Sequence, residues 1–357
     1  MHADLPQLLP LICPACRRMS AHGLELFTLS LSVLRHAPDH PDEVEDGILT
    51  CENPACHRRY PIVAGIPILL PNLTHFASTQ WLSLAEFSEP EVLCALVQDG
   101  PDDAALPRVL EYLSIYLDAH FGDFATPVPD GPEPGCGGAE LWHALARAKD
   151  QKVARTIELG CGPGRGLYEL APGTELVVGL DLQFAALLYA RRVLSGKSVR
   201  YARRKSGRYY GSARLCVPPC GETAVQFVCG DALDPPFAPG SFDRVVSLNV
   251  LDSVSDAPRH LSVLDGLCLP GGELLLASPF SWQTGIVAED GRLNTEDPAA
   301  YLRRVFETGQ GLAASYSIKT TRDVRWTLRR DARSAASYYS HYLVAQKHTE
   351  PSADPAA

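Results

Sequence analysis

The segment Glu158-Leu159-Gly160-Cys161-Gly162-Pro163-Gly164-Arg165-Gly166 places an acidic residue and four glycines at one expected turn. Glycine adopts positive φ without strain and lets a ligand approach the backbone closely. Such a turn, between a strand and a helix, suits a nucleotide-like cofactor. Taken alone, it fits a dinucleotide as well as other cofactors of this kind.

Two carboxylates further along the chain make the cofactor chemistry more specific. Asp181 ends an expected strand, where its side chain can accept hydrogen bonds from both ribose hydroxyls of a nucleoside. Asp231 follows the next expected strand, in Gly230-Asp231-Ala232, where it can bond an adenine amino group. Ligands of open α/β sheets bind at the carboxyl ends of the strands, so we expect all three features at one edge.

Four cysteines near the N-terminus have the spacing of a metal site. Cys13 and Cys16 are separated by two residues, and Cys51 and Cys56 by four. Four thiolates on two tight turns suit tetrahedral zinc, and a site filled entirely by protein ligands is structural rather than catalytic. His57 is an alternative ligand to Cys51. The competing interpretation is four free cysteines in a metal-free fold.

The elements that must position these residues alternate between strand-like and helix-like segments from about residue 138 onward. This alternation predicts an α/β fold with a mostly parallel sheet. An apolar helix is expected from Phe184 to Val193. Strands are expected at 156–159, 175–180, 225–228, 243–248 and 273–278, with two more near 314–319 and 342–345.

Composition divides the chain and limits its function. We expect a cysteine domain at 1–72, a helical segment and linker at 73–137, a catalytic domain at 138–348 and a disordered tail at 349–357. No apolar run is long enough for a bilayer and no secretory signal is recognisable, which predicts a cytoplasmic protein that does not bind membranes. Eleven cysteines without such a signal favour metal binding or free thiols over disulfides. A net charge of −10 argues against general nucleic-acid binding.

Residues 138–346 resemble the class I S-adenosylmethionine methyltransferases. The resemblance rests on the glycine turn, the two acidic strand ends, Phe242-Asp243-Arg244-Val245-Val246 and Pro270-Gly271-Gly272. It implies a Rossmann-like sheet of seven strands. A nicotinamide-binding domain, or a similar fold without cofactor, is the alternative, and Asp231 and the Pro-Gly-Gly turn disfavour it. The cofactor-binding residues that follow are Glu158, Gly160, Cys161, Gly162, Gly164, Asp181, Leu182, Asp231, Ala232 and Asn249.

Methyl transfer from a sulfonium has a good leaving group, so catalysis can consist mostly of proximity and orientation. A general base is needed only where the nucleophile loses a proton. Asn249, just after the fourth expected strand, would face the reaction cleft. Asp252 is the candidate for orienting a substrate N–H or accepting its proton; the equally weighted alternative is that it caps the next helix.

The N-terminal segment resembles the small zinc-ribbon activator proteins that partner methyltransferases of tRNA, rRNA and translation factors. The four cysteines and the segment from Tyr60 to Pro71 carry this resemblance. It implies a ribbon that contacts the catalytic domain of its own chain. Ile66, Ile68 and Leu69 are candidates for this contact, unless they only fill the core of the ribbon.

Residues 191–214 hold nine Lys or Arg and no acidic residue. Within them, Ser198 to Gly211 is expected to form a hairpin that turns near Ser206-Gly207. Basic residues interleaved with aromatic ones can bind RNA through phosphate contacts and base stacking. The alternative is a solvated hairpin whose charges offset acidic surroundings.

The catalytic half is also similar to the methyltransferase domain of ovothiol synthases, which methylate the imidazole of 4-mercaptohistidine. Four segments carry this similarity: Leu248-Asn249-Val250-Leu251-Asp252, Ala277-Ser278-Pro279-Phe280-Ser281-Trp282, the inserted segment near Arg200-Tyr201 and residues 338–347. The sulfoxide synthase domain of that family is absent. The favoured hypothesis is transfer to a nitrogen of a small molecule, and the alternative is transfer to RNA or a translation factor.

Overall fold

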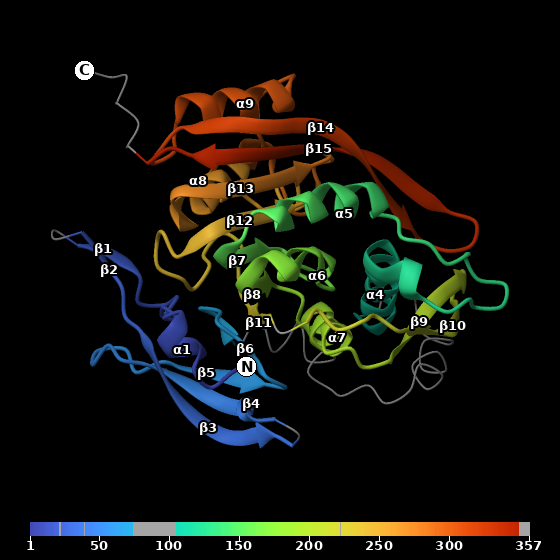
Figure 1. The fold of residues 1–357 in the computed structure, drawn as a ribbon, viewed down its shortest axis with the longest axis horizontal. Helices are drawn as coiled ribbons and strands as arrows, with labels where there is room; N and C mark the ends of the chain where they lie inside the picture. Colours follow the sequence, from blue (N-terminus) through green and yellow to red (C-terminus); the bar gives the residue numbers. More distant parts are fainter. Residues whose placement is uncertain (21–22, 39, 74–104, 222, 350–357) are drawn as a thin grey trace.

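A computed structural model describes residues 1–20, 23–38, 40–73, 105–221 and 223–349 (Figure 1). The expectations for 74–104, and for nearly all of the tail, lie outside these residues. Among the described residues, no helix combines the length and the apolar character needed to cross a membrane.

The centre of the molecule is a sheet of seven strands in the order β11-β8-β7-β12-β13-β15-β14. All neighbouring pairs from β11 to β13 are parallel, whereas β15 runs antiparallel to both β13 and β14. The expected Rossmann-like sheet of seven strands is therefore confirmed. The strands are β7 (Val153–Leu159), β8 (Thr174–Asp181), β11 (Ala224–Cys229), β12 (Phe242–Leu248), β13 (Cys268–Ser278), β14 (Tyr316–Arg329) and β15 (Ala335–Lys347).

Helices cover both faces of this sheet (Figure 1). This cover explains why the central strands are continuously apolar rather than alternating. One face carries α4 (Ala105–Phe121), α5 (Ala139–Leu145), α6 (Arg165–Leu170) and α7 (Phe184–Leu194), and the other carries α8 (Ala257–Leu267) and α9 (Pro298–Thr308). Four short 3-10 helices complete this part: η1 (Gly122–Phe124), η2 (Ala146–Asp150), η3 (Ala171–Gly173) and η4 (Glu289–Gly291).

The N-terminal part is a small β domain. It contains α1 (Leu5–Leu8), a hairpin of β1 (Arg18–Ser20) and β2 (Gly23–Glu25), and an antiparallel sheet of β3 (Leu29–Ala37), β4 (His40–Cys51), β5 (Arg59–Val63) and β6 (Ile66–Pro67). Cys13 and Cys16 lie in the segment before β1, Cys51 is the last residue of β4, and Cys56 lies in the connection between β4 and β5.

The N-terminal domain contacts the edge of the central sheet. Ile68 forms a parallel bridge with Cys229 of β11, and the Leu69 N–H donates to the Cys229 carbonyl at 2.8 Å. Arg17 forms an ion pair with Asp234 at 2.9 Å. Ile66 and Ile68 are buried in a cluster made mainly of α4, α7 and β9–β11 residues. The expected contact within the chain is therefore present, and it involves these two isoleucines.

The expected basic hairpin exists as β9 (Val199–Ser206) and β10 (Tyr209–Leu215), but two of its arginines are not on its surface. Arg203 is 1% exposed and forms an ion pair with Asp118 of α4, while Arg204 pairs with Glu111 of the same helix. Both expectations, an RNA-binding surface and a solvated hairpin, are wrong for these two residues. RNA contact by the rest of residues 191–214 stays a prediction.

Candidate functional site

A cavity of about 940 Å³, here called the main cavity, lies at the carboxyl ends of β7, β8, β11, β12 and β13. This is the edge at which open α/β sheets bind ligands. Its volume is near the upper end of the range for small-molecule sites. The residues that line it include Glu158, Gly160, Gly162, Asp181, Leu182, Asp231, Ala232, Asn249 and Asp252. Nine of the residues expected to bind the cofactor or act on the substrate therefore share one cavity.

The glycine turn forms one wall of the main cavity. Gly160 and Gly162 have φ angles of 74° and 51°, which residues with a Cβ rarely adopt. The Gly162 N–H donates to Asp181 Oδ2 at 2.8 Å, and the Gln183 N–H donates to Asp181 Oδ1 at 2.7 Å. The two backbone donors hold the carboxylate of Asp181 at the end of β8 in one orientation. Burial raises the pKa of this carboxyl group, and the backbone donors oppose that rise.

Cys161 and Gly164 take a different place from the one expected for cofactor-binding side chains. The Cys161 side chain is fully buried and packs behind the turn against Gly179 of β8. Gly164 has a φ of 90° at the start of α6 and faces Ala190 of α7. Neither residue lines the main cavity. Their contribution is to fold the turn against the neighbouring helix and strand.

The carboxylate of Glu158 is buried near the glycine turn. It is 1% exposed, and its Oε2 atom has no hydrogen-bond partner among the described residues. Burial, together with the negative charge of Asp181, raises the pKa of Glu158 well above its ordinary value. A buried polar atom without a partner is costly, and Glu158 lines the main cavity, so a ligand bound there is the candidate partner for this oxygen.

Asp231 lines the main cavity from the loop after β11. Its Oδ1 accepts the Leu233 N–H at 2.8 Å, which closes a tight turn and fixes the carboxylate. Asp231 is exposed, whereas the neighbouring Ala232 is half-buried. Leu182 is 48% exposed and lines the main cavity.

Asn249 adopts a φ of 57°, in the left-handed region that asparagine tolerates better than most residues other than glycine. The Ser340 hydroxyl donates to Asn249 Oδ1 at 2.7 Å, and this bond orients the amide. Asn249 Nδ2 is buried and lacks a hydrogen-bond partner within the described part of the chain. The cavity therefore contains an open donor as well as the open acceptor of Glu158.

Asp252 is 3% exposed and accepts the Ser281 N–H through Oδ2 at 2.8 Å. Burial raises its pKa. The alternative that Asp252 caps the next helix is wrong, because Asp256 caps α8 by accepting the Arg259 N–H at 2.9 Å. Asp252 lines the main cavity instead.

The sequence did not indicate the aromatic residues that face the same cavity. Tyr112, Tyr116 and His120 come from α4, Trp142 from α5, and Trp326 and Tyr338 from the β14–β15 hairpin. The Trp142 ring lies 4.9 Å from His120 and 5.4 Å from Trp326, measured between centroids. The spacing of the α4 residues, one every four positions, was the available signal, but it is also the spacing of an ordinary buried helix face.

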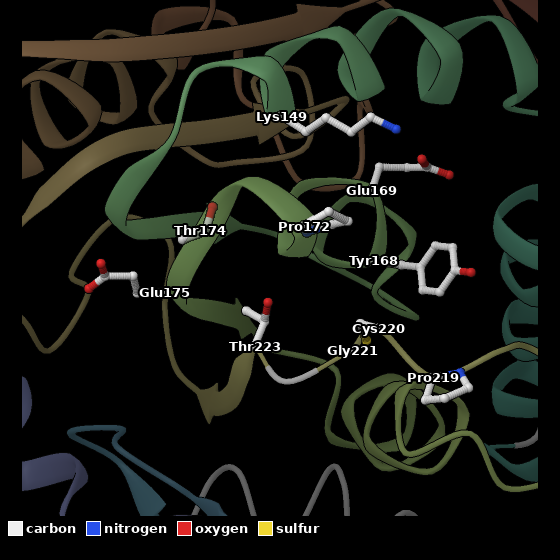
Figure 2. A pocket seen from close by; sticks show the side chains of 10 residues that line it. All are labelled: Lys149, Tyr168, Glu169, Pro172, Thr174, Glu175, Pro219, Cys220, Gly221 and Thr223. Carbon is white, nitrogen blue, oxygen red and sulfur yellow. The ribbon is translucent and has the colours of Figure 1, made fainter.

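A second cavity, of about 930 Å³, lies at the other end of the sheet (Figure 2). Thr174 begins β8 and Thr223 precedes β11, so both mark amino ends of strands. Figure 2 shows Lys149, Tyr168 and Glu169 extending toward the same side. None of the expected site residues lines this cavity, and the location is not the one where such sheets bind ligands.

The four N-terminal cysteines converge. Their sulfur atoms all lie within 4.8 Å of one another, and Cys16 Sγ is 3.6 Å from Cys51 Sγ. Four ligands at about 2.3 Å from a tetrahedral zinc ion require sulfur separations of this size. His57 is exposed and does not belong to the group. The thiols therefore fit a zinc ion with Cys51, rather than His57, as the fourth ligand.

Comparison with known proteins assigns the domain around the main cavity. Residues 157–276 match the family model described as a methyltransferase domain. The chain contains a methyltransferase domain. The matched residues include the glycine turn, Asp181, Asp231, Asn249 and Asp252.

A curated relative supports the same class. The chain is 26% identical over 155 residues to a phthiotriol/phenolphthiotriol dimycocerosates methyltransferase of Mycobacterium leprae, a match that covers 43% of this chain and 48% of the relative. The chain thus spans about half the length of that relative. Its own substrate and partners do not follow from this match.

Solved structures with a similar arrangement are more distant. The N-methyltransferase NodS of Bradyrhizobium japonicum is 16% identical, with a TM-score of 0.37 over 59% of this chain and 97% of that one. A structure described as a complex of the Trm112 methyltransferase activator and a putative methyltransferase of Haloferax volcanii matches with 17% identity and a TM-score of 0.38, over 59% and 89%. These scores are too low to carry an argument about function. The resemblances to ovothiol synthases and to zinc-ribbon activators stay predictions.

Proposed function

We propose that the methyltransferase domain transfers a methyl group from S-adenosylmethionine to a nitrogen atom of a small molecule, with a histidine-derived imidazole as the leading acceptor. The observation that carries the proposal is the buried carboxylate of Asp252, which faces the main cavity together with the amide of Asn249. When bound, S-adenosylmethionine supplies an electrophilic methyl group on a sulfonium.

The residues of the cavity fit this cofactor. The Asp181 carboxylate can accept hydrogen bonds from the ribose hydroxyls, the Asp231 loop suits the adenine, and the glycine turn leaves space beside the backbone. The open acceptor of Glu158 and the raised pKa of its carboxyl group suit a cationic ligand group, because a positive charge would favour the ionised carboxylate.

The acceptor is inferred from what Asp252 and the aromatic residues can bind. An imidazole has one N–H and one nitrogen with a free lone pair. The Asp252 carboxylate can accept the N–H, which leaves the other nitrogen as the nucleophile. Transfer would break the sulfur–methyl bond of the sulfonium and leave the ring cationic, and the ring could then pass its N–H proton to Asp252. Aromatic rings favour a flat substrate and stabilise such a cation.

The chain also supports a proposal for its metal. We infer that Cys13, Cys16, Cys51 and Cys56 bind one structural zinc ion. The Asn53 backbone N–H donates to Cys51 Sγ and the Asn53 side chain donates to Cys16 Sγ, each at 3.4 Å. Such N–H···S contacts stabilise thiolates, which are the metal-binding form of cysteine.

A mass-spectrometric screen tests the acceptor. The purified chain and S-adenosylmethionine are incubated with imidazole, amine and thiol metabolites in one set and with total RNA in the other. We expect methylation of an imidazole or another small nitrogen compound. Methylation of RNA alone would contradict the proposal.

The variant Asp252→Asn tests the role of Asp252 as a general base. We expect kcat/KM to fall by about 100-fold, in the range of a lost general base, while S-adenosylhomocysteine still binds.

In the unmodified chain the rate must fall as the pH is lowered, because Asp252 accepts a proton only when ionised. Burial raises its pKa, so this fall begins above the ordinary aspartate value of about 3.9. A profile unchanged in Asp252→Asn would assign the titration to the substrate and remove Asp252 from the mechanism.

A further inference from the structure

One face of helix α4 presents polar and aromatic side chains to the main cavity. Tyr112, Tyr116 and His120 follow one another at intervals of four residues, which places them on one helix face, and all three line the cavity. The Tyr112 and Tyr116 rings lie 4.5 Å apart. His120 is the last of the three and the one beside the glycine turn. A Cβ atom on Gly162 would lie 3.5 Å from His120 Cε1 and 3.6 Å from Nε2.

The imidazole of His120 is held in one orientation. Its Nδ1 accepts the Arg165 backbone N–H at 3.3 Å, and the Arg165 guanidinium donates to the His120 carbonyl at 2.8 Å. The rings of Trp142 and Trp326 pack against it at 4.9 and 5.8 Å. Because Nδ1 is the acceptor of a backbone N–H, the single proton of the neutral ring must be on Nε2.

The charge state of His120 is also fixed by its surroundings. Burial and the nearby Arg165 guanidinium lower the pKa of the imidazole to about 3, so the ring is neutral at physiological pH. Nε2–H is therefore a neutral donor beside a cationic guanidinium. Such a position favours an anionic acceptor over a cation, because an ammonium group has no lone pair with which to accept the N–H.

We propose that His120 binds the carboxylate of the amino-acid part of S-adenosylmethionine through Nε2–H. This inference rests on the proposed function. Asp181 and Asp231 are assigned to the nucleoside part, which leaves the amino-acid part at the glycine turn, next to His120 and Glu158. Glu158 offers an acceptor for the ammonium group, and His120 offers the donor that the carboxylate needs.

The test compares two ligands that differ in the amino-acid part. S-adenosylhomocysteine carries it, whereas 5′-methylthioadenosine keeps the nucleoside and the sulfur but lacks the carboxylate and the ammonium group. Calorimetry gives the Kd of each ligand for the full chain and its variants. The ratio of the two Kd values then reports the amino-acid part alone, without depending on turnover.

Two variants of His120 distinguish the roles of its two nitrogen atoms. His120→Asn keeps an acceptor near the Nδ1 position but removes the distal donor, whereas His120→Gln keeps a donor near the Nε2 position. We expect His120→Asn to weaken S-adenosylhomocysteine binding about tenfold or more, the size of a lost hydrogen bond to a charged group, with 5′-methylthioadenosine unchanged. His120→Gln should retain most of the affinity for both.

Controls assign each outcome. His143→Asn replaces an exposed histidine of α5 that does not line the main cavity and should leave the ratio unchanged, while Asp231→Ala should weaken both ligands alike. Equal weakening of both ligands by His120→Asn, or no weakening of either, would overturn the inference while leaving the proposed function standing. If the unmodified chain binds neither ligand, the proposed function itself fails and this inference fails with it.

Discussion

The cysteine cluster and the main cavity both bring together polar groups from distant parts of the chain. They differ in whether those groups find their partners within the protein. In the cluster, four thiols face one another within 4.8 Å, and Asn53 and Tyr60 surround them with further contacts. In the cavity, a carboxylate oxygen of Glu158 and the amide nitrogen of Asn249 are buried without partners among the described residues. A closed set of ligands indicates a structural role, whereas open donors and acceptors indicate a site for an exchangeable ligand.

We expect the largest effect from removing cysteines of the cluster. The double variant Cys13→Ser with Cys16→Ser removes half of the zinc ligands, and structural zinc contributes on the order of 10 kcal/mol to the folding of small domains. We expect zinc analysis to fall from about one ion per chain to none, with a lower melting temperature. The control is Cys216→Ser with Cys220→Ser, which changes two cysteines outside the cluster. Equal zinc content in the two double variants would contradict the structural role.

The basic hairpin extends the comparison to a third region, in which Arg203 and Arg204 form ion pairs with Asp118 and Glu111 of α4. Arg203→Met leaves Asp118 buried without its cationic partner, which costs about 3–5 kcal/mol for a buried pair. We expect chemical denaturation to give a free energy of unfolding lower by about this amount. Arg208→Met, an exposed position on the same hairpin, should change it by less than about 1 kcal/mol. Similar values for the two variants would show that Arg203 is not a structural residue.

Much of the fold could be predicted because buried parallel strands are recognisable in the sequence. The strands around Ile157, Val178 and Val246 are short apolar runs between turn residues, and the structure has strands at all seven expected places. The ends of three of them carry Asp181, Asp231 and Asn249, so topology alone brings these residues to one edge. This part of the site follows from strand order and needs no knowledge of side-chain packing.

The remaining parts depend on contacts between distant residues. The arginines of the hairpin looked like a basic surface because their partners lie 85 and 93 residues earlier, on α4. His120 and Trp326 meet only once α4 and β14 pack together, and no local pattern marks either as a cavity residue. Asp252 likewise had the spacing of a helix cap, and only the hydrogen bond made by Asp256 excludes that role.

The most direct test of the central claim is a calorimetric titration of S-adenosylhomocysteine into the full chain and into Asp181→Ala. The Asp181 carboxylate is held by two backbone donors at the end of β8, where it is expected to bind the ribose. We predict saturable binding at one site per chain and at least about tenfold weaker binding in the variant, the loss expected for hydrogen bonds to a charged group. Absence of binding, or the same affinity in Asp181→Ala, would contradict the assignment of the main cavity as the cofactor site.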